Sequence, residues 1–140
     1  MLRIGQLAAL TNVSVDTLRF YERKVLLFPQ GKSAGGFRLY GNEAVVVVRF
    51  IKQAQRCGFS LSEVRELLEL RASNDVCCGD VRRRAVAKKQ QLEKKISAMK
   101  SMSQALNRLI ANCTTEGSPI EECPILAALE GESPVLASGR

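Results

Sequence analysis

The chain has 140 residues and a formal net charge of +7, and it contains five cysteines but no histidine. This length gives room for one compact domain with a projecting element rather than for two full globular domains. No apolar run approaches the roughly 20 residues that span a bilayer, and the N-terminus lacks the order of a signal peptide, so we expect a soluble, cytoplasmic protein without a membrane partner.

The basic charge is unevenly distributed along the chain. Residues 1–60 hold nine Lys and Arg against three Asp and Glu, residues 61–112 hold eleven against six, and residues 113–140 hold one against five. A basic body suggests a polyanionic partner, most often nucleic acid, although a solvated basic face has the same composition. An enzyme has little support, because the sequence shows no histidine, no recognisable carboxylate pair and no phosphate-binding loop.

The first 24 residues predict two short helices joined by a tight turn. Apolar residues from Ile4 to Leu10 follow helical spacing, and Ser14 can cap a second helix over about residues 15–24. The second helix carries polar and basic residues outside its apolar positions, which is typical of a helix-turn-helix. An ordinary helical hairpin would show the same pattern.

Residues 25–41 predict a small β-hairpin, or wing, because glycines separate two short apolar stretches. Arg, Lys and Tyr are the usual donors to DNA phosphates, so three residues of this segment could reach a DNA backbone: Lys32, Arg38 and Tyr40. A solvated loop would use the same residue types.

Residues 42–71 predict a second pair of helices. Four consecutive valines favour a strand, but the apolar positions around them repeat at helical spacing, and Gly58 stands where a helix would end. Ser60 and Glu63 then form a capping box that opens the next helix. We interpret Cys57, just before Gly58, as a small buried residue.

One long helix is predicted over residues 79–112, because this segment has no glycine or proline after its first residue. Apolar residues repeat about every 3.5 positions along it, and a helix of this length measures about 50 Å. The small body cannot cover such a stripe, so we expect pairing with a second copy in an antiparallel coiled coil. A helix packed along its own domain is the alternative.

The cysteines predict a metal site shared by two chains. Cys78 and Cys113 flank the long helix and would lie about 50 Å apart, too far to bind one ion within one chain. In an antiparallel pair, Cys78 from the other subunit would meet Cys113 and Cys123, with Cys77 as a possible further ligand. Three thiolates favour Hg(II), Pb(II) or Cd(II), and Zn(II) is possible if water or Cys77 completes the coordination.

Together these motifs resemble the heavy-metal-responsive branch of the MerR family of transcriptional regulators. The resemblance lies in IGQLAALTNVSVDTLRFYER, GGFRLYG, RFIKQAQRCGFSLSEVRELL, Cys78 and the stretch from Cys113 to CPIL, and it covers essentially the whole chain. It implies a mainly α fold in four parts: a winged helix-turn-helix domain with a second helix pair (1–71), a linker (72–78), a dimerisation helix (79–112), and a metal-binding loop with a short helix and tail (113–140).

The resemblance also implies a mechanism. It implies a homodimer that binds a palindromic operator, represses, and on binding a divalent metal ion activates a metal-resistance promoter for RNA polymerase by bending and untwisting the DNA. By position it implies DNA contacts from six residues: Arg19, Tyr21, Lys32, Arg38, Tyr40 and Arg56. Relatives that sense monovalent ions carry serine in place of Cys78, which favours divalent ions here, and the zinc-sensing relatives have further ligands that this chain lacks.

The chain departs from its relatives at the end of the second helix, and its thiols allow a second function. Relatives usually have glycine where this chain has Val25, which leaves open whether the second helix has the left-handed ending that glycine provides. The alternative function is a thiol redox-sensing regulator on the same fold, in which Cys77 or Cys78 forms a disulfide with Cys113.

Overall fold

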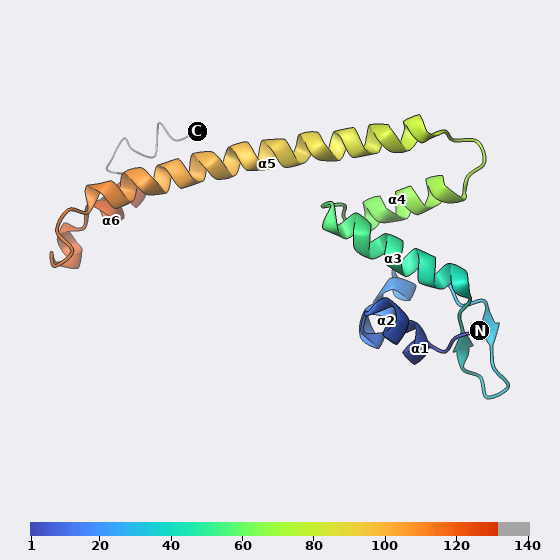
Figure 1. Cartoon of the computed structure of the whole chain (residues 1–140). Helices are drawn as coiled ribbons and strands as arrows, with labels where there is room; N and C mark the ends of the chain where they lie inside the picture. Colours follow the sequence, from blue (N-terminus) through green and yellow to red (C-terminus); the bar gives the residue numbers. More distant parts are fainter. Residues whose placement is uncertain (132–140) are drawn as a thin grey trace. The chain divides into compact units, whose positions relative to one another are not determined.

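The structure, a computed structural model, describes residues 1–131 and is mainly helical (Figure 1). It confirms the predicted helix-turn-helix with a hairpin, followed by a long helix. The chain divides after Lys88 into two compact units, which are described separately. Residues 132–140 of the predicted tail lie outside the described residues. Within residues 1–131, no helix has both the length and the apolar character needed to cross a membrane.

Helices α1 (Ile4–Thr11) and α2 (Val15–Arg23) form the helix-turn-helix. Asn12 turns the chain with a left-handed φ of 54°, a conformation in which asparagine is enriched. The Ser14 side chain accepts a hydrogen bond from the Thr17 backbone N–H at 3.1 Å and so caps α2, as predicted.

The predicted wing is a short antiparallel hairpin. Strand β1 (Gly31–Lys32) pairs with β2 (Arg38–Leu39), and Lys32 lies opposite Arg38. Gly36 lies in the turn with a φ of 83°, a conformation that glycine adopts at no steric cost. The hairpin places both basic residues of the wing at the surface.

Helices α3 (Asn42–Arg56) and α4 (Leu61–Ala72) complete the first unit. Val48 is fully buried while Val46 is 44% exposed, so the valine run does not alternate as a strand would. Helix α1 packs against α2 and α3, and α3 packs against α4. The largest fully buried side chains of the core are Tyr40, Leu7, Leu18, Ile51, Val48 and Val64.

Helix α3 ends at the predicted glycine. Gly58 has a φ of 89°, its N–H donates to the Gln55 carbonyl at 3.0 Å, and the Phe59 N–H donates to the Ala54 carbonyl at 3.2 Å. These two bonds define a Schellman motif, which satisfies carbonyls that the helix leaves without partners.

Helix α2 ends in the same motif although its left-handed residue is a valine. Val25 has a φ of 62°, its N–H donates to the Glu22 carbonyl at 3.0 Å, and the Leu26 N–H donates to the Tyr21 carbonyl at 2.9 Å. A β-branched residue with positive φ is a genuine outlier. The left-handed ending is therefore retained at the cost of backbone strain.

Helix α5 (Cys78–Asn112) begins one residue before the predicted start and ends at the predicted residue. Its residues up to Lys88 belong to the first unit. Beyond Lys88, large apolar side chains are exposed along the helix in the single chain: Leu92, Ile96, Met99, Met102, Leu106 and Ile110. Pairing of this stripe with a second copy stays a prediction.

The second unit continues after α5 with a loop, the short 3-10 helix η1 (Ile120–Glu122) and helix α6 (Pro124–Leu129). A proline at the first position of α6 suits a helix start, because its missing N–H has no helical partner there. Leu109 of α5 and Ala128 of α6 are buried within this unit.

Candidate DNA interface and metal ligands

Helix α2 turns one face to the core and another to solvent. Leu18 and Tyr21 are buried, whereas Arg19 and Arg23 are exposed. The second helix of a helix-turn-helix presents such exposed residues to base edges and phosphates. Arg19 therefore lies on the surface where the sequence predicts it.

Glu22 joins α2 to the wing. Its side chain is 10% exposed, and its carboxylate accepts hydrogen bonds from the Arg38 guanidinium and from the Tyr40 hydroxyl. Charge-assisted hydrogen bonds are about twice as strong as neutral ones. Glu22 thus fixes the position of the exposed Arg38 relative to α2, a role that its place in the helix sequence does not reveal.

The two tyrosines predicted at the DNA surface are buried in the core. Tyr40 is 0% exposed, and its burial together with the bond to Glu22 raises its pKa to about 12. Tyr21 is 5% exposed, burial raises its pKa, and its hydroxyl lies 3.5 Å from the Gln55 side-chain oxygen. Neither ring offers an exposed surface to DNA in the free protein, because both supply apolar area to the core.

A basic hollow of about 1030 Å³ is lined by residues of α1, α2 and the wing. Four arginines line it: Arg3, Arg19, Arg23 and Arg38. The Arg3 guanidinium lies 4.6 Å from the centre of the exposed Phe37 ring in the wing turn. Several guanidinium groups around one concave surface suit the phosphates of a DNA strand. Sequence reasoning did not select Arg3 or Arg23, although Arg23 follows Arg19 at the i, i+4 spacing of one helix face.

Arg56 and Lys32 are also exposed, as predicted for DNA contacts. Arg56 is the last residue of α3 and lines a second hollow, of about 490 Å³, together with Lys52 and the turn that precedes α2. The Lys52 ammonium group donates to the Thr11 carbonyl at 3.0 Å, so this lysine holds the turn between α1 and α2. Lys32 lies on the first strand of the wing.

Two of the three predicted metal ligands lie at the two ends of α5, and the third lies just before α6. Cys78 is its first residue and is exposed, whereas Cys113 directly follows its last residue and is half-buried. Cys123 directly precedes α6 and is also half-buried. All five cysteines are free, and residues 1–131 of the single chain contain no group of three or more side chains that could hold a metal ion. A ligand set shared by two chains stays a prediction.

Cys77 and Cys57 differ in what surrounds them. The Cys77 backbone N–H donates to the Asp80 carboxylate at 2.9 Å, and this bond lowers the pKa of Asp80. Cys77 directly precedes α5 and Asp80 lies in its first turn, so the bond caps the start of the helix. The Cys77 thiol is exposed beside Cys78. Cys57 is exposed too, contrary to the prediction of a buried residue. It is the C-cap of α3 and lies beyond Ala54, the last buried position of that helix.

Comparisons with known proteins agree with this arrangement. A family described as "MerR HTH family regulatory protein" matches residues 2–70, and one described as "MerR, DNA binding" matches residues 45–109. The mercuric resistance operon regulatory protein of Shigella flexneri is 38% identical over 132 residues, which cover 94% of this chain and 90% of that protein. The chain belongs to the MerR family. MerR-family regulators are DNA-binding transcription factors and not enzymes.

Two further relatives extend the match over nearly the whole chain. The HTH-type transcriptional regulator ZntR of Escherichia coli (strain K12) is 34% identical and covers 99% of both chains. The crystal structure of the transcription regulator PbrR691 from Ralstonia metallidurans CH34 in complex with lead(II) matches with a TM-score of 0.84 at 32% identity, over 92% of this chain and 99% of that chain. The chain described here is therefore a metal-responsive transcriptional regulator of the MerR family. The metals differ among its relatives.

Proposed function

We propose that this MerR-family regulator represses a metal-resistance promoter and, on binding a divalent soft metal ion, activates it for RNA polymerase by distorting the bound DNA. The observation that carries the proposal is the distribution of the thiols. Cys78 belongs to the unit that holds the helix-turn-helix, whereas Cys113 and Cys123 belong to the second unit. An ion that joins Cys78 of one subunit to Cys113 and Cys123 of the other would link metal binding to a DNA-binding unit.

The proposed metal site takes Cys78 of the partner subunit together with Cys113 and Cys123 of this chain. The donor set fits soft ions, because thiolates select Hg(II), Pb(II) and Cd(II), and Zn(II) would need water or Cys77 as a fourth ligand. The absence of a disulfide among the five cysteines leaves all these thiols available as ligands. The lead(II) complex of PbrR691 supports the class of metal.

The proposed DNA contacts are the exposed basic side chains of the first unit: Arg19, Lys32, Arg38 and Arg56, with Arg3 and Arg23 added from the basic hollow. Contacts to phosphates fix the register of the protein, and contacts to base edges read the sequence. Tyr21 and Tyr40 support these side chains from the core in our proposal. A homodimer would present two such surfaces to the two halves of a palindromic operator.

The energy that this mechanism requires is modest. Bending and untwisting a DNA site of 20–30 base pairs costs on the order of a few kcal/mol. A metal ion that binds one conformation of the dimer more tightly shifts the equilibrium by that difference in binding free energy. A preference of roughly 30-fold supplies about 2 kcal/mol, which is enough to change the population of the distorted complex substantially.

The experiment that tests the proposal compares Cys78→Ser with Cys57→Ser in a promoter reporter assay with Hg(II), Pb(II), Cd(II) and Zn(II). We expect Cys78→Ser to lose the response to every ion while operator affinity stays unchanged. Cys57→Ser removes another exposed thiol outside the proposed ligand set and should respond as the unmodified protein does.

A normal metal response of Cys78→Ser would remove Cys78 from the ligand set. If oxidation alone switched transcription and the reduced protein bound none of these ions, the protein would instead be a thiol redox sensor. Titration of the reduced dimer with each ion, followed by mass spectrometry, separates the two outcomes.

A further inference from the structure

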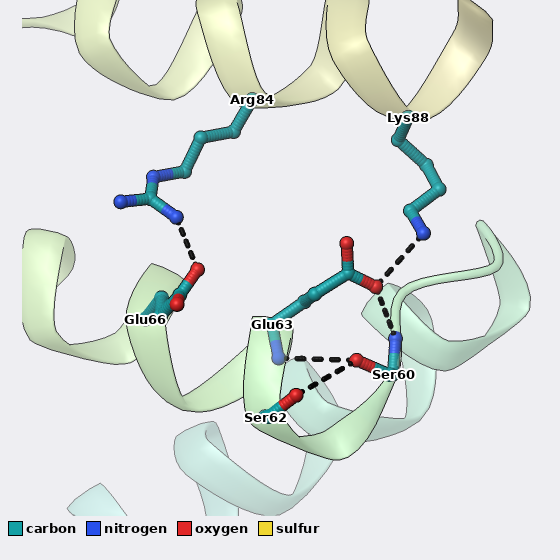
Figure 2. A network of polar contacts seen from close by, with 6 residues as sticks. All are labelled: Ser60, Ser62, Glu63, Glu66, Arg84 and Lys88. Atoms are coloured by element: carbon teal, nitrogen blue, oxygen red, sulfur yellow. Dashed lines mark hydrogen bonds and ion pairs between the residues drawn. The ribbon is translucent and has the colours of Figure 1, made fainter. Parts of the chain in front are cut away.

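Lys88 is a buried lysine in the third turn of α5. Its side chain is 8% exposed, and its ammonium group lies 2.8 Å from a carboxylate oxygen of Glu63 in α4 (Figure 2). The ammonium group also lies 5.6 Å from the centre of the Phe59 ring. Lysine is almost never fully buried unless it is paired. The pair with Glu63 stabilises the buried ammonium group where α4 and α5 meet.

Glu63 is fixed from its own helix as well. The Ser60 N–H donates to its carboxylate at 2.8 Å, and the Glu63 N–H donates to the Ser60 hydroxyl at 3.2 Å, which completes the predicted capping box. The hydrogen bond from Lys88, followed by that from Ser60, lowers the pKa of Glu63 to about 2. Arg84 pairs with Glu66 in a second, exposed ion pair one turn away (Figure 2).

The same turn of α4 also contacts α2, the second or recognition helix of the helix-turn-helix. Arg65 lies between Glu63 and Glu66 in sequence, and its guanidinium donates to the backbone carbonyl of Lys24, the C-cap of α2. A cation at this position satisfies a helix-terminal carbonyl and interacts favourably with the helix dipole. Residues 63–66 therefore contact both α5 and the end of α2.

We propose that Lys88 and Glu63 are positioning residues for the metal response, which tie the first turns of α5 to α4 and, through Arg65, to the recognition helix. The inference rests on the proposed function. Cys78 stands ten residues before Lys88 on the continuous helix α5, a separation of about 15 Å. An ion that displaces Cys78 would then move α4 and α2 together with α5.

An ion pair with a buried ammonium group suits this role better than a pair in which both side chains are exposed. An exposed pair such as Arg84 with Glu66 contributes little and can open in solvent. Opening the pair of Lys88 and Glu63 would take a carboxylate away from a buried ammonium group, which is unfavourable. The pair therefore resists opening, so a movement of the first turns of α5 would be passed on to α4.

The test is Lys88→Met in the full-length dimer, because methionine keeps most of the side-chain length and removes the charge. We expect the ratio of metal-induced to uninduced transcription to fall about tenfold, within the range of typical coupling between sites, while metal affinity and metal-free operator affinity change less than about twofold. Lys94→Met is the matched control, since Lys94 is an exposed lysine of α5 on the face away from the apolar stripe. It should keep the induction ratio of the unmodified protein.

Glu63→Gln is the second variant, because glutamine keeps the capping box while removing the charge, and it decides the question if Lys88→Met folds poorly. An unchanged induction ratio in the folded variants overturns the inference. An equal loss of operator affinity with and without metal also overturns it, because that result indicates a purely structural role. If the unmodified protein responds to none of the four ions, the proposed function fails and the inference fails with it.

Discussion

Glu22 offers a direct test of how the wing is held to the recognition helix. The carboxylate accepts from both Arg38 and Tyr40, and the Tyr40 side chain is 0% exposed. Replacing Glu22 by alanine would leave the Tyr40 hydroxyl buried without a partner. It would also release Arg38, whose side chain is 58% exposed and can be hydrated.

The expected magnitude follows from these two exposures. A buried hydroxyl without a hydrogen bond costs about 1–3 kcal/mol, and an exposed ion pair contributes about 0–1 kcal/mol. We therefore expect Glu22→Ala to lower the free energy of unfolding by about 2–3 kcal/mol. Tyr40→Phe removes one of two donors to Glu22 and should cost about 1 kcal/mol.

The assay is a double-mutant cycle by urea denaturation at one fixed protein concentration, because the stability of a dimer depends on concentration. In Glu22→Ala with Tyr40→Phe no hydroxyl remains to be satisfied, so we expect a coupling of about 1–2 kcal/mol. Glu43→Ala is the matched control, since Glu43 forms an ion pair with Arg71 in which both side chains are exposed. It should cost less than about 1 kcal/mol.

Strictly additive effects of the two substitutions would refute the reasoning, because they would mean that Tyr40 does not depend on Glu22. A cost of Glu22→Ala no larger than that of Glu43→Ala would refute it as well. Operator affinity gives an independent readout. Removing a negative charge from a DNA-binding surface should by itself strengthen binding. Weaker specific binding of Glu22→Ala would therefore indicate that Arg38 has lost its position.

Two further predictions concern the same helix. Val25→Gly should raise the free energy of unfolding by roughly 0.5 kcal/mol in the same denaturation assay, since relief of about 2 kcal/mol of left-handed strain exceeds the entropy cost of glycine and the loss of a side chain that is 53% exposed. Gly58→Val places valine in the equivalent motif of α3 and should have the opposite sign, and equal signs would contradict the strain argument. Arg19→Ala should weaken operator binding both with and without metal, as measured by gel-shift titration, and an unchanged affinity would remove Arg19 from the DNA contacts.

Much of the first unit could be predicted because its signals are local. The Ser14 cap, the capping box of Ser60 and Glu63, and the left-handed Gly58 each depend on hydrogen bonds that reach at most five residues along the chain. Helical spacing around the valine run outweighed β-propensity, which describes packing context more than backbone preference.

The candidate site was less predictable because its contacts are distant in sequence. The type and spacing of residues placed Arg19 and Arg38 at the surface correctly. They could not show that the buried Tyr40 hydroxyl donates to Glu22, eighteen positions earlier. The Schellman motif at Val25 could not be predicted from local propensity either. The hydrogen bonds of the motif and the contact from Arg65 hold a conformation that valine itself disfavours.

Helix α5 shows the same limit in its repeat. The apolar repeat of about 3.5 positions is interrupted at Lys89, and it does not indicate that the neighbouring Lys88 is buried. In the structure Lys88 is buried against α4, and the first compact unit ends at this residue. The first turns of α5 therefore contribute Lys88 to packing within their own chain, whereas the exposed apolar stripe beyond Lys89 remains for another partner. A repeat that is interrupted where the helix changes partner is what one helix with two packing surfaces should show.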